Sequence, residues 1–214
     1  MHLVLGSSSN LAKELASQLK EKTYFFGRSN PHSLPNFLEG LDLRNPANHE
    51  KIGVKFLTLI QATETDDNSI IFLNGLSTDN WEDAVNVNLL ATAHISTRIA
   101  EYSLNNRKRL NLVFINSYSM FAGKKIPYAT TKAALTGLMH SLNNKYPAAV
   151  RANQILPGAF EGGMTHDWSL EKKEKIAKNT LAGSIATERQ IIAGIKFLLE
   201  NDYVYNETLN LKGF

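Results

Sequence analysis

The sequence contains no cysteine, which excludes disulfide bonds and zinc sites built on thiolates. It also has no large excess of charge of either sign, because 23 basic and 20 acidic residues give a formal net charge of +3. This balance argues against a nucleic-acid-binding protein. No apolar run is long enough to cross a bilayer, and residues 1–5 reach Gly6 before a signal-peptide core could form. We therefore expect a cytoplasmic protein with no membrane or nucleic-acid partner.

Short apolar runs alternate with segments of helical periodicity along the whole chain. Leu11, Leu15 and Leu19 recur every four residues, as on one face of a helix. The runs that we predict to be strands are residues 3–5, 23–26, 69–73, 110–115, 150–156 and 208–211. Strands that alternate with helices and are apolar on both faces predict an α/β fold with a Rossmann-like, doubly wound parallel sheet. Because no linker or repeat interrupts the pattern, we expect residues 1–214 to form a single domain.

Tyr128 and Lys132 are four residues apart in a predicted helix, which places them on one face, one turn from each other. A neighbouring ammonium favours the phenolate and lowers the pKa of a tyrosine from its ordinary value of about 10. Such a tyrosine can donate a proton to a forming alkoxide or take one from an alcohol. Amphipathic helices also show this spacing by chance, so the assignment depends on the residues at other turns.

Turns rich in small and polar residues follow the predicted strands, where ligands bind in folds of this type. After the first strand, residues 6–12 bring backbone amides to a helix N-terminus, which can hold a pyrophosphate. After the second, Arg28 and Ser29 stand where an acidic residue would bind the ribose hydroxyls of NAD(H). An arginine there can accept a 2′-phosphate instead. The chain is therefore predicted to prefer NADP(H) over NAD(H).

Taken in order, these segments resemble the short-chain dehydrogenase/reductase family over essentially the full length of the chain. The strongest matches are Tyr128-Ala-Thr-Thr-Lys132, Asn116-Ser-Tyr-Ser119 and Val87-Asn88-Leu89. The resemblance implies a catalytic set of Asn88, Ser119, Tyr128 and Lys132. It implies cofactor contacts from Gly6, Ser8, Ser9, Asn10, Leu11, Arg28, Ser29, Asp42, Leu43, Asn74, Gly75, Tyr128, Lys132, Pro157 and Gly158, and it implies no metal ion.

The roles follow from the same resemblance. The expected reaction transfers a hydride between the nicotinamide of NADP(H) and a small-molecule carbonyl or secondary alcohol. Ser119 would polarise the carbonyl, and Tyr128 would deliver the proton. Lys132 would lower the tyrosine pKa and hold the nicotinamide ribose, while Asn88 would anchor a water that connects Lys132 to solvent. Asp42 would contact the adenine.

Several positions depart from the family pattern. Asn10 and Ala12 replace glycines in the first turn, where asparagine tolerates a left-handed backbone. Ser117 is an alternative to Ser119, which we prefer because it lies three residues after Asn116. Gly162 occupies a position where the family often has a threonine, for which Thr165 is a candidate substitute.

The shortened loops between these motifs keep a second hypothesis open, a non-catalytic dinucleotide-binding sensor or scaffold. A sugar-nucleotide epimerase or dehydratase is disfavoured, because that group usually needs a larger substrate domain. The polar residues Glu161, His166, Asp167 and Trp168 favour a polar or sugar-like substrate only weakly, and His166 with Asp167 does not predict a metal site.

The helix after Tyr128 carries the small residues Ala133, Ala134 and Gly137. Small residues let helices approach closely, and the resembling family buries the equivalent helices between subunits. This face predicts a homodimer or homotetramer. The alternative is that the small residues pack on the protein's own sheet.

Overall fold

The structure is a computed structural model that describes residues 1–19, 21–38, 40–123, 125–162, 165 and 167–213. Seven strands in this part of the chain form one sheet in the order β3-β2-β1-β4-β5-β6-β7, and every neighbouring pair is parallel. Their bounds are β1 His2–Leu5, β2 Thr23–Phe26, β3 Phe37–Leu38, β4 Asp67–Phe72, β5 Arg109–Ile115, β6 Val150–Pro157 and β7 Thr208–Leu211. The predicted doubly wound, Rossmann-like α/β fold is thus confirmed.

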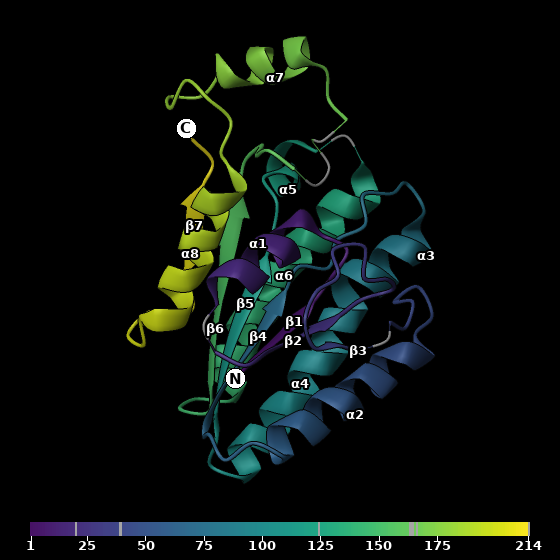
Figure 1. The fold of residues 1–214 in the computed structure, drawn as a ribbon, viewed down its shortest axis with the longest axis vertical. Coiled ribbons are helices and arrows are strands. Elements are labelled where there is room, and N and C mark those ends of the chain that lie inside the picture. The colour runs from purple at the N-terminus through teal and green to yellow at the C-terminus, as the bar shows by residue number, and fades with distance from the viewer. Residues whose placement is uncertain (20, 39, 124, 163–164, 166, 214) are drawn as a thin grey trace.

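Helices cover both faces of the sheet (Figure 1). Their bounds are α1 Asn10–Gln18, α2 Ala47–Gln61, α3 Trp81–Ala84, the π-helical turn η1 Val85–Leu90, α4 Ala91–Asn105, α5 Ser119–Ala122, α6 Ile126–Lys145, α7 Leu170–Ala177 and α8 Glu188–Glu200. One core cluster joins α2, α4 and α6 to the sheet through residues such as Phe56, Ile95 and Met139. The other joins α1 and α8 to the opposite face through Leu15 and Ile195. All five side chains are fully buried.

The strands are apolar on both faces because each face is covered by helices. Every residue of β1 and of β6 is buried, for example. Since all strands run the same way, the turns that follow them meet at one end of the sheet. The short helix α5 and the outlying helix α7 lie toward that end (Figure 1). The turns that carry the predicted site residues lie at the same end.

Candidate functional site

A cavity of about 930 Å³ lies at the carboxyl ends of the strands, between the turns that follow β1, β2, β4, β5 and β6. Most of the residues predicted from the sequence line it: Gly6, Ser8, Ser9, Leu11, Arg28, Asp42, Leu43, Asn74, Gly75, Ser119, Tyr128, Lys132, Pro157 and Gly158. Asn10, Ser29 and Asn88 are not part of its lining. The fold therefore gathers segments that lie far apart in the sequence into one site.

The turn after β1 needs glycine at one position. Gly6 has φ +114°, and a Cβ there would lie 2.9 Å from the backbone nitrogen of Asn74. The following helix is capped by Ser9, whose hydroxyl accepts a hydrogen bond of 3.1 Å from the Leu11 amide. Asn10 begins α1 and is not among the residues with positive φ, so the turn does not need the tolerance of asparagine for a left-handed backbone. The result is a close-packed turn with the N-terminus of α1 beside the cavity, as a pyrophosphate site requires.

The end of β2 is tied to this turn. The buried Ser7 hydroxyl donates a 2.9 Å hydrogen bond to the Ser29 carbonyl. The side chain of Arg28 is exposed and lines the cavity, whereas Ser29 contributes only this backbone contact. Of the two residues predicted to select NADP(H), only Arg28 is therefore in a position to touch a ligand in the cavity.

The carboxylate of Asp42 is already engaged. The Arg44 guanidinium donates from Nε to both of its oxygens at 3.1 and 3.0 Å, and the Arg44 amide donates to Oδ1 at 3.0 Å. These hydrogen bonds, aided by the charge of Arg28, lower the pKa of Asp42. The backbone of the same turn is fixed from α2, where His49 Nε2 lies 2.8 Å from the Leu43 carbonyl. Arg44, which sequence reasoning overlooked, also lines the cavity.

Asn88 lies in the π-helical turn η1, a helix irregularity that is frequent at functional sites. Its side chain is fully buried. Its Oδ1 accepts a 2.6 Å hydrogen bond from the Leu76 amide, and its Nδ2 donates to the Leu76 carbonyl and to Thr131 Oγ1, both at 3.1 Å. Asn88 therefore joins the turn after β4 to α6, the helix that carries Tyr128 and Lys132.

Lys132 is 3% exposed, and its ammonium donates to the Ile115 carbonyl at 2.7 Å and to the Asn74 carbonyl at 3.2 Å. Among the described residues it has no carboxylate partner. An ammonium has three N–H donors, so one is left for a group in the cavity. Burial lowers the pKa of Lys132 to about 8. A buried ionisable group whose pKa is shifted in this way is typical of a functional site.

Tyr128 lies on the same face of α6, with its ring centroid 5.9 Å from the Lys132 nitrogen. It is 5% exposed, and this burial raises its pKa, an effect only partly opposed by the neighbouring Ser117 side chain. The predicted depression of the tyrosine pKa by Lys132 is therefore not found in the protein alone. Burial disfavours the charged phenolate, and its effect on the pKa of Tyr128 is larger than that of the neighbouring groups.

Of the two candidate serines, Ser117 is the one that acts on the pKa of Tyr128, which it lowers against the larger effect of burial. Ser119 is the first residue of α5, and its amide donates a 3.2 Å hydrogen bond to the Ser117 hydroxyl. Both serines line the cavity, and Ser117 is the one whose side chain acts on the pKa of the phenol. The preference for Ser119 over Ser117 therefore stays a prediction, which activity measurements on the two variants would decide.

Comparison with known proteins agrees with this geometry. The model of the short chain dehydrogenase family matches residues 69–173. The 3-oxoacyl-[acyl-carrier-protein] reductase of Haemophilus influenzae is 26% identical over 239 aligned positions, which cover 99% of this chain and 96% of that protein. The chain belongs to the short-chain dehydrogenase/reductase family. Another relative, the NADP(+)-dependent L-rhamnose 1-dehydrogenase of Thermoplasma acidophilum, is 28% identical, but the match spans 61% of this chain and only 53% of that protein.

Solved structures of the family share the fold. The ligand-free aldohexose dehydrogenase of Thermoplasma acidophilum superposes with a TM-score of 0.84 at 16% identity, covering 99% of this chain and 92% of that one. A 4-hydroxyisoleucine dehydrogenase in complex with NADH and succinate gives 0.82 at 18% identity, covering 100% and 98%. At these identities the likeness concerns the fold alone.

The segment that follows β6 lines the cavity with Phe160, Trp168 and Ile176. Trp168 is one of the residues that weakly favoured a polar substrate, whereas Glu161 and Asp167 are not part of the lining. The Thr165 hydroxyl donates to the Gly162 carbonyl at 3.0 Å and to the Phe160 carbonyl, so it stabilises its own turn. His166 lies outside the described residues.

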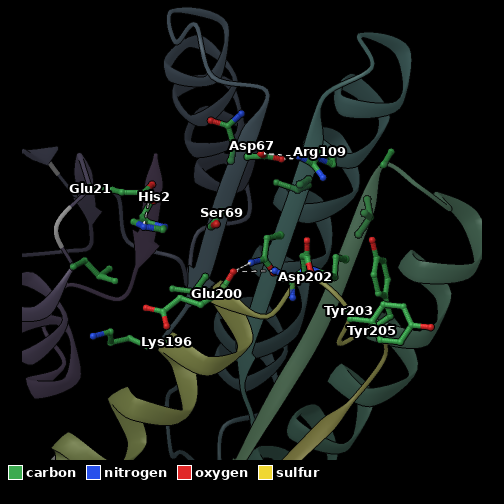
Figure 2. Close-up of a pocket in the computed structure, with 18 of the residues that line it drawn as sticks. His2, Glu21, Asp67, Ser69, Arg109, Lys196, Glu200, Asp202, Tyr203 and Tyr205 are labelled. Atoms are coloured by element: carbon green, nitrogen blue, oxygen red, sulfur yellow. Dashed lines mark hydrogen bonds and ion pairs between the residues drawn. The ribbon is translucent and has the colours of Figure 1, made fainter.

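A second cavity, of about 900 Å³, opens at the opposite end of the sheet, beside the amino ends of β1, β4, β5 and β6 (Figure 2). Arg109 forms an ion pair with Asp67 there at 2.6 Å, and His2 Nε2 lies 3.3 Å from the Glu21 carboxylate. None of the residues predicted from the sequence lines it.

In the part of the chain that the structure describes, no three His, Asp or Glu side chains cluster as metal ligands, and no helix is long and apolar enough to span a bilayer.

Proposed function

We propose that this protein is an NADP(H)-dependent oxidoreductase that interconverts a carbonyl compound and a secondary alcohol. The observation that carries the proposal is the pair formed by Lys132, a buried ammonium with no carboxylate partner among the described residues, and Tyr128, a buried phenol on the same face of α6. Both line a cavity at the carboxyl ends of a parallel sheet, where ligands bind in this fold. The relatives named above are oxidoreductases by their names.

The residues of the cavity fit a dinucleotide. Gly6 gives a pyrophosphate close access to the backbone beside the N-terminus of α1. Arg28 supplies a positive charge at the end of β2, where a 2′-phosphate is accommodated in folds of this type. Near the other end of the site, the unused N–H of Lys132 can donate to a ribose hydroxyl. When bound, the nicotinamide supplies or accepts the hydride.

The protein's own part in carbonyl reduction follows from these positions. The Ser117 hydroxyl donates a hydrogen bond to the substrate oxygen and polarises the carbonyl. As a hydride reaches the carbonyl carbon, the Tyr128 O–H bond breaks and its proton passes to the same oxygen, which gives the alcohol. Lys132 stabilises the phenolate left behind. Asn88 keeps the turn after β4 and α6 together, so that these groups stay in place. In this scheme Ser117 takes the role that we first gave to Ser119.

The test is a panel of aldehydes, ketones and secondary alcohols offered with NADPH or NADP⁺, followed by the absorbance of the reduced nicotinamide. We expect turnover with at least one compound and a lower rate with NAD(H). Replacing Arg28 with aspartate should shift the preference toward NAD(H), because a carboxylate repels the 2′-phosphate and binds ribose hydroxyls. Tight NADPH binding with no turnover on any compound would instead support the non-catalytic sensor or scaffold.

A further inference from the structure

We propose that Arg44 is a second residue that binds the 2′-phosphate of NADP(H). Asp42 then acts on the cofactor only indirectly, by positioning the side chain of Arg44. This inference rests on the proposed function, since it names a residue that would select the cofactor of the same site. Arg44 lines the cavity together with Arg28 and Asp42.

Backbone contacts bring the two arginines to the same side of the cavity. Strands β2 and β3 are parallel neighbours, so the turns that follow them lie side by side. Their contact is close: a Cβ on Gly40 would lie only 2.5 Å from the Cα of Arg28. The backbone of Arg44 is fixed from the π-helical turn, where Asn86 Nδ2 donates to the Arg44 carbonyl at 3.1 Å.

The Arg44 side chain is held in a defined direction. Its Nε lies 3.1 and 3.0 Å from the two oxygens of Asp42, while its side chain remains 46% exposed. Because Nε and one terminal nitrogen face the carboxylate, the N–H groups on the far edge of the guanidinium stay available. A planar, oriented fork of donors is the geometry that favours phosphate recognition.

Two guanidinium groups lie at this end of the cavity, and guanidinium groups are suited to hydrogen-bond a phosphate. Arg28 and Arg44 contribute two positive charges and Asp42 one negative charge, and the charge of Arg28 acts on Asp42. Asp83 is a second acidic neighbour of Arg44. In the arrangement expected from the sequence, Asp42 would itself contact the adenine of the cofactor, with Arg44 as its support. Four contacts from Arg44 leave the Asp42 carboxylate poorly suited to that role.

The test measures binding by calorimetry, without turnover. The ligands are NADPH, NADH, adenosine 2′,5′-bisphosphate and adenosine 5′-monophosphate, and the variants are Arg44→Gln and Asp42→Asn. The matched control is Arg98→Gln. That arginine is similarly exposed, at 41%, and pairs with Glu50 at 3.4 Å on the outer surface of α2 and α4.

We expect Arg44→Gln to weaken binding of both ligands that carry a 2′-phosphate by roughly tenfold or more, since it removes charge-assisted hydrogen bonds. Binding of NADH and of the monophosphate should change by less than about twofold. Asp42→Asn should lose part of the preference for ligands that carry a 2′-phosphate. Arg98→Gln should keep the whole preference.

Three results would overturn the inference: equal weakening of all four ligands in Arg44→Gln, loss of NADH binding in Asp42→Asn, or a wild type that does not distinguish the bisphosphate from the monophosphate. Because no step depends on catalysis, a protein that binds as expected but never turns over would disprove the proposed function and leave this inference standing.

Discussion

The cavity at the carboxyl ends of the strands measures about 930 Å³ and the cavity at the amino ends about 900 Å³, yet different cationic groups line them. At the amino ends, the guanidinium of Arg109 pairs with Asp67, and that of Arg151 donates to the Leu198 and Asn201 carbonyls at 2.7 Å. At the carboxyl ends, the buried ammonium of Lys132 has backbone carbonyls as partners and one N–H to spare. Size does not distinguish the two cavities, but the buried ammonium of Lys132 beside the Tyr128 ring marks the one at the carboxyl ends.

The largest effect should come from Tyr128→Phe, which keeps the ring and removes the proton donor. We expect turnover to fall by about 10²- to 10⁴-fold, the usual contribution of a positioned acid. NADPH affinity, measured by fluorescence titration, should stay the same. The control is Tyr205→Phe, a half-exposed tyrosine at the other cavity, which should be as active as the wild type. Equal losses in the two variants would remove the distinction between the cavities.

Replacing Ser117 with alanine should lower turnover by about 10²-fold or more, because a preorganised donor to the substrate oxygen is lost. Ser119→Ala keeps that donor, and its amide can still donate to Ser117, so it should retain most of the activity. Steady-state rates of the two variants decide the assignment. A crippled Ser119→Ala beside a nearly normal Ser117→Ala would restore the preference drawn from the sequence.

The buried lysine should also appear in the pH dependence of stability. The pKa of Lys132 is about 8 in the folded protein and about 10.4 in the unfolded chain. Between these values the unfolded chain binds a proton that the folded protein does not, so this group makes stability rise with pH. From pH 7.5 to 9.5 the unfolding free energy of the wild type should rise by about 2 kcal/mol more than that of Lys132→Met.

Urea unfolding at the two pH values measures this difference. The raised pKa of Tyr128 acts in the opposite direction, but only above its ordinary value of about 10, outside the measured range. Lys196→Met, at the other cavity, should behave as the wild type does, since solvent reaches its ammonium. Identical slopes in the wild type and Lys132→Met would show that the ammonium is solvated.

The smallest effect concerns the outer face of α6. Ala133 and Gly137 are exposed, and a Cβ on Gly137 would meet no atom within 4 Å, so this face does not pack on the protein's own sheet. We propose that it joins subunits in a homodimer or homotetramer. Gly137→Leu should then weaken association in light scattering at micromolar concentration while leaving the monomer folded. A wild type that is monomeric at that concentration would refute the proposal.

The sequence predicted the parallel sheet because short, continuous apolar runs indicate strands that are buried on both faces. Strands β1 and β6 are buried in this way. It located most of the cavity lining because parallel strands bring their following turns together. It could not choose between Ser117 and Ser119, since alternation puts both on one side of an extended strand. It also missed Arg44, whose role depends on a contact between two loops that no local pattern encodes.

The sign of the tyrosine pKa was beyond the sequence for a similar reason. A spacing of four residues shows that Tyr128 and Lys132 share a face, but not how deeply that face is buried. In the structure both side chains are at most 5% exposed, so burial raises the pKa of the tyrosine and lowers that of the lysine. Burial is a property of the whole packed fold.

The most direct test of the account is hydrogen–deuterium exchange with and without NADPH, since it reports which cavity binds the cofactor. We predict slower exchange on addition of NADPH in residues 6–11 and 116–123, which border the carboxyl-end cavity, and no change in residues 199–205 at the amino-end cavity. Slower exchange confined to residues 199–205 would contradict the central claim.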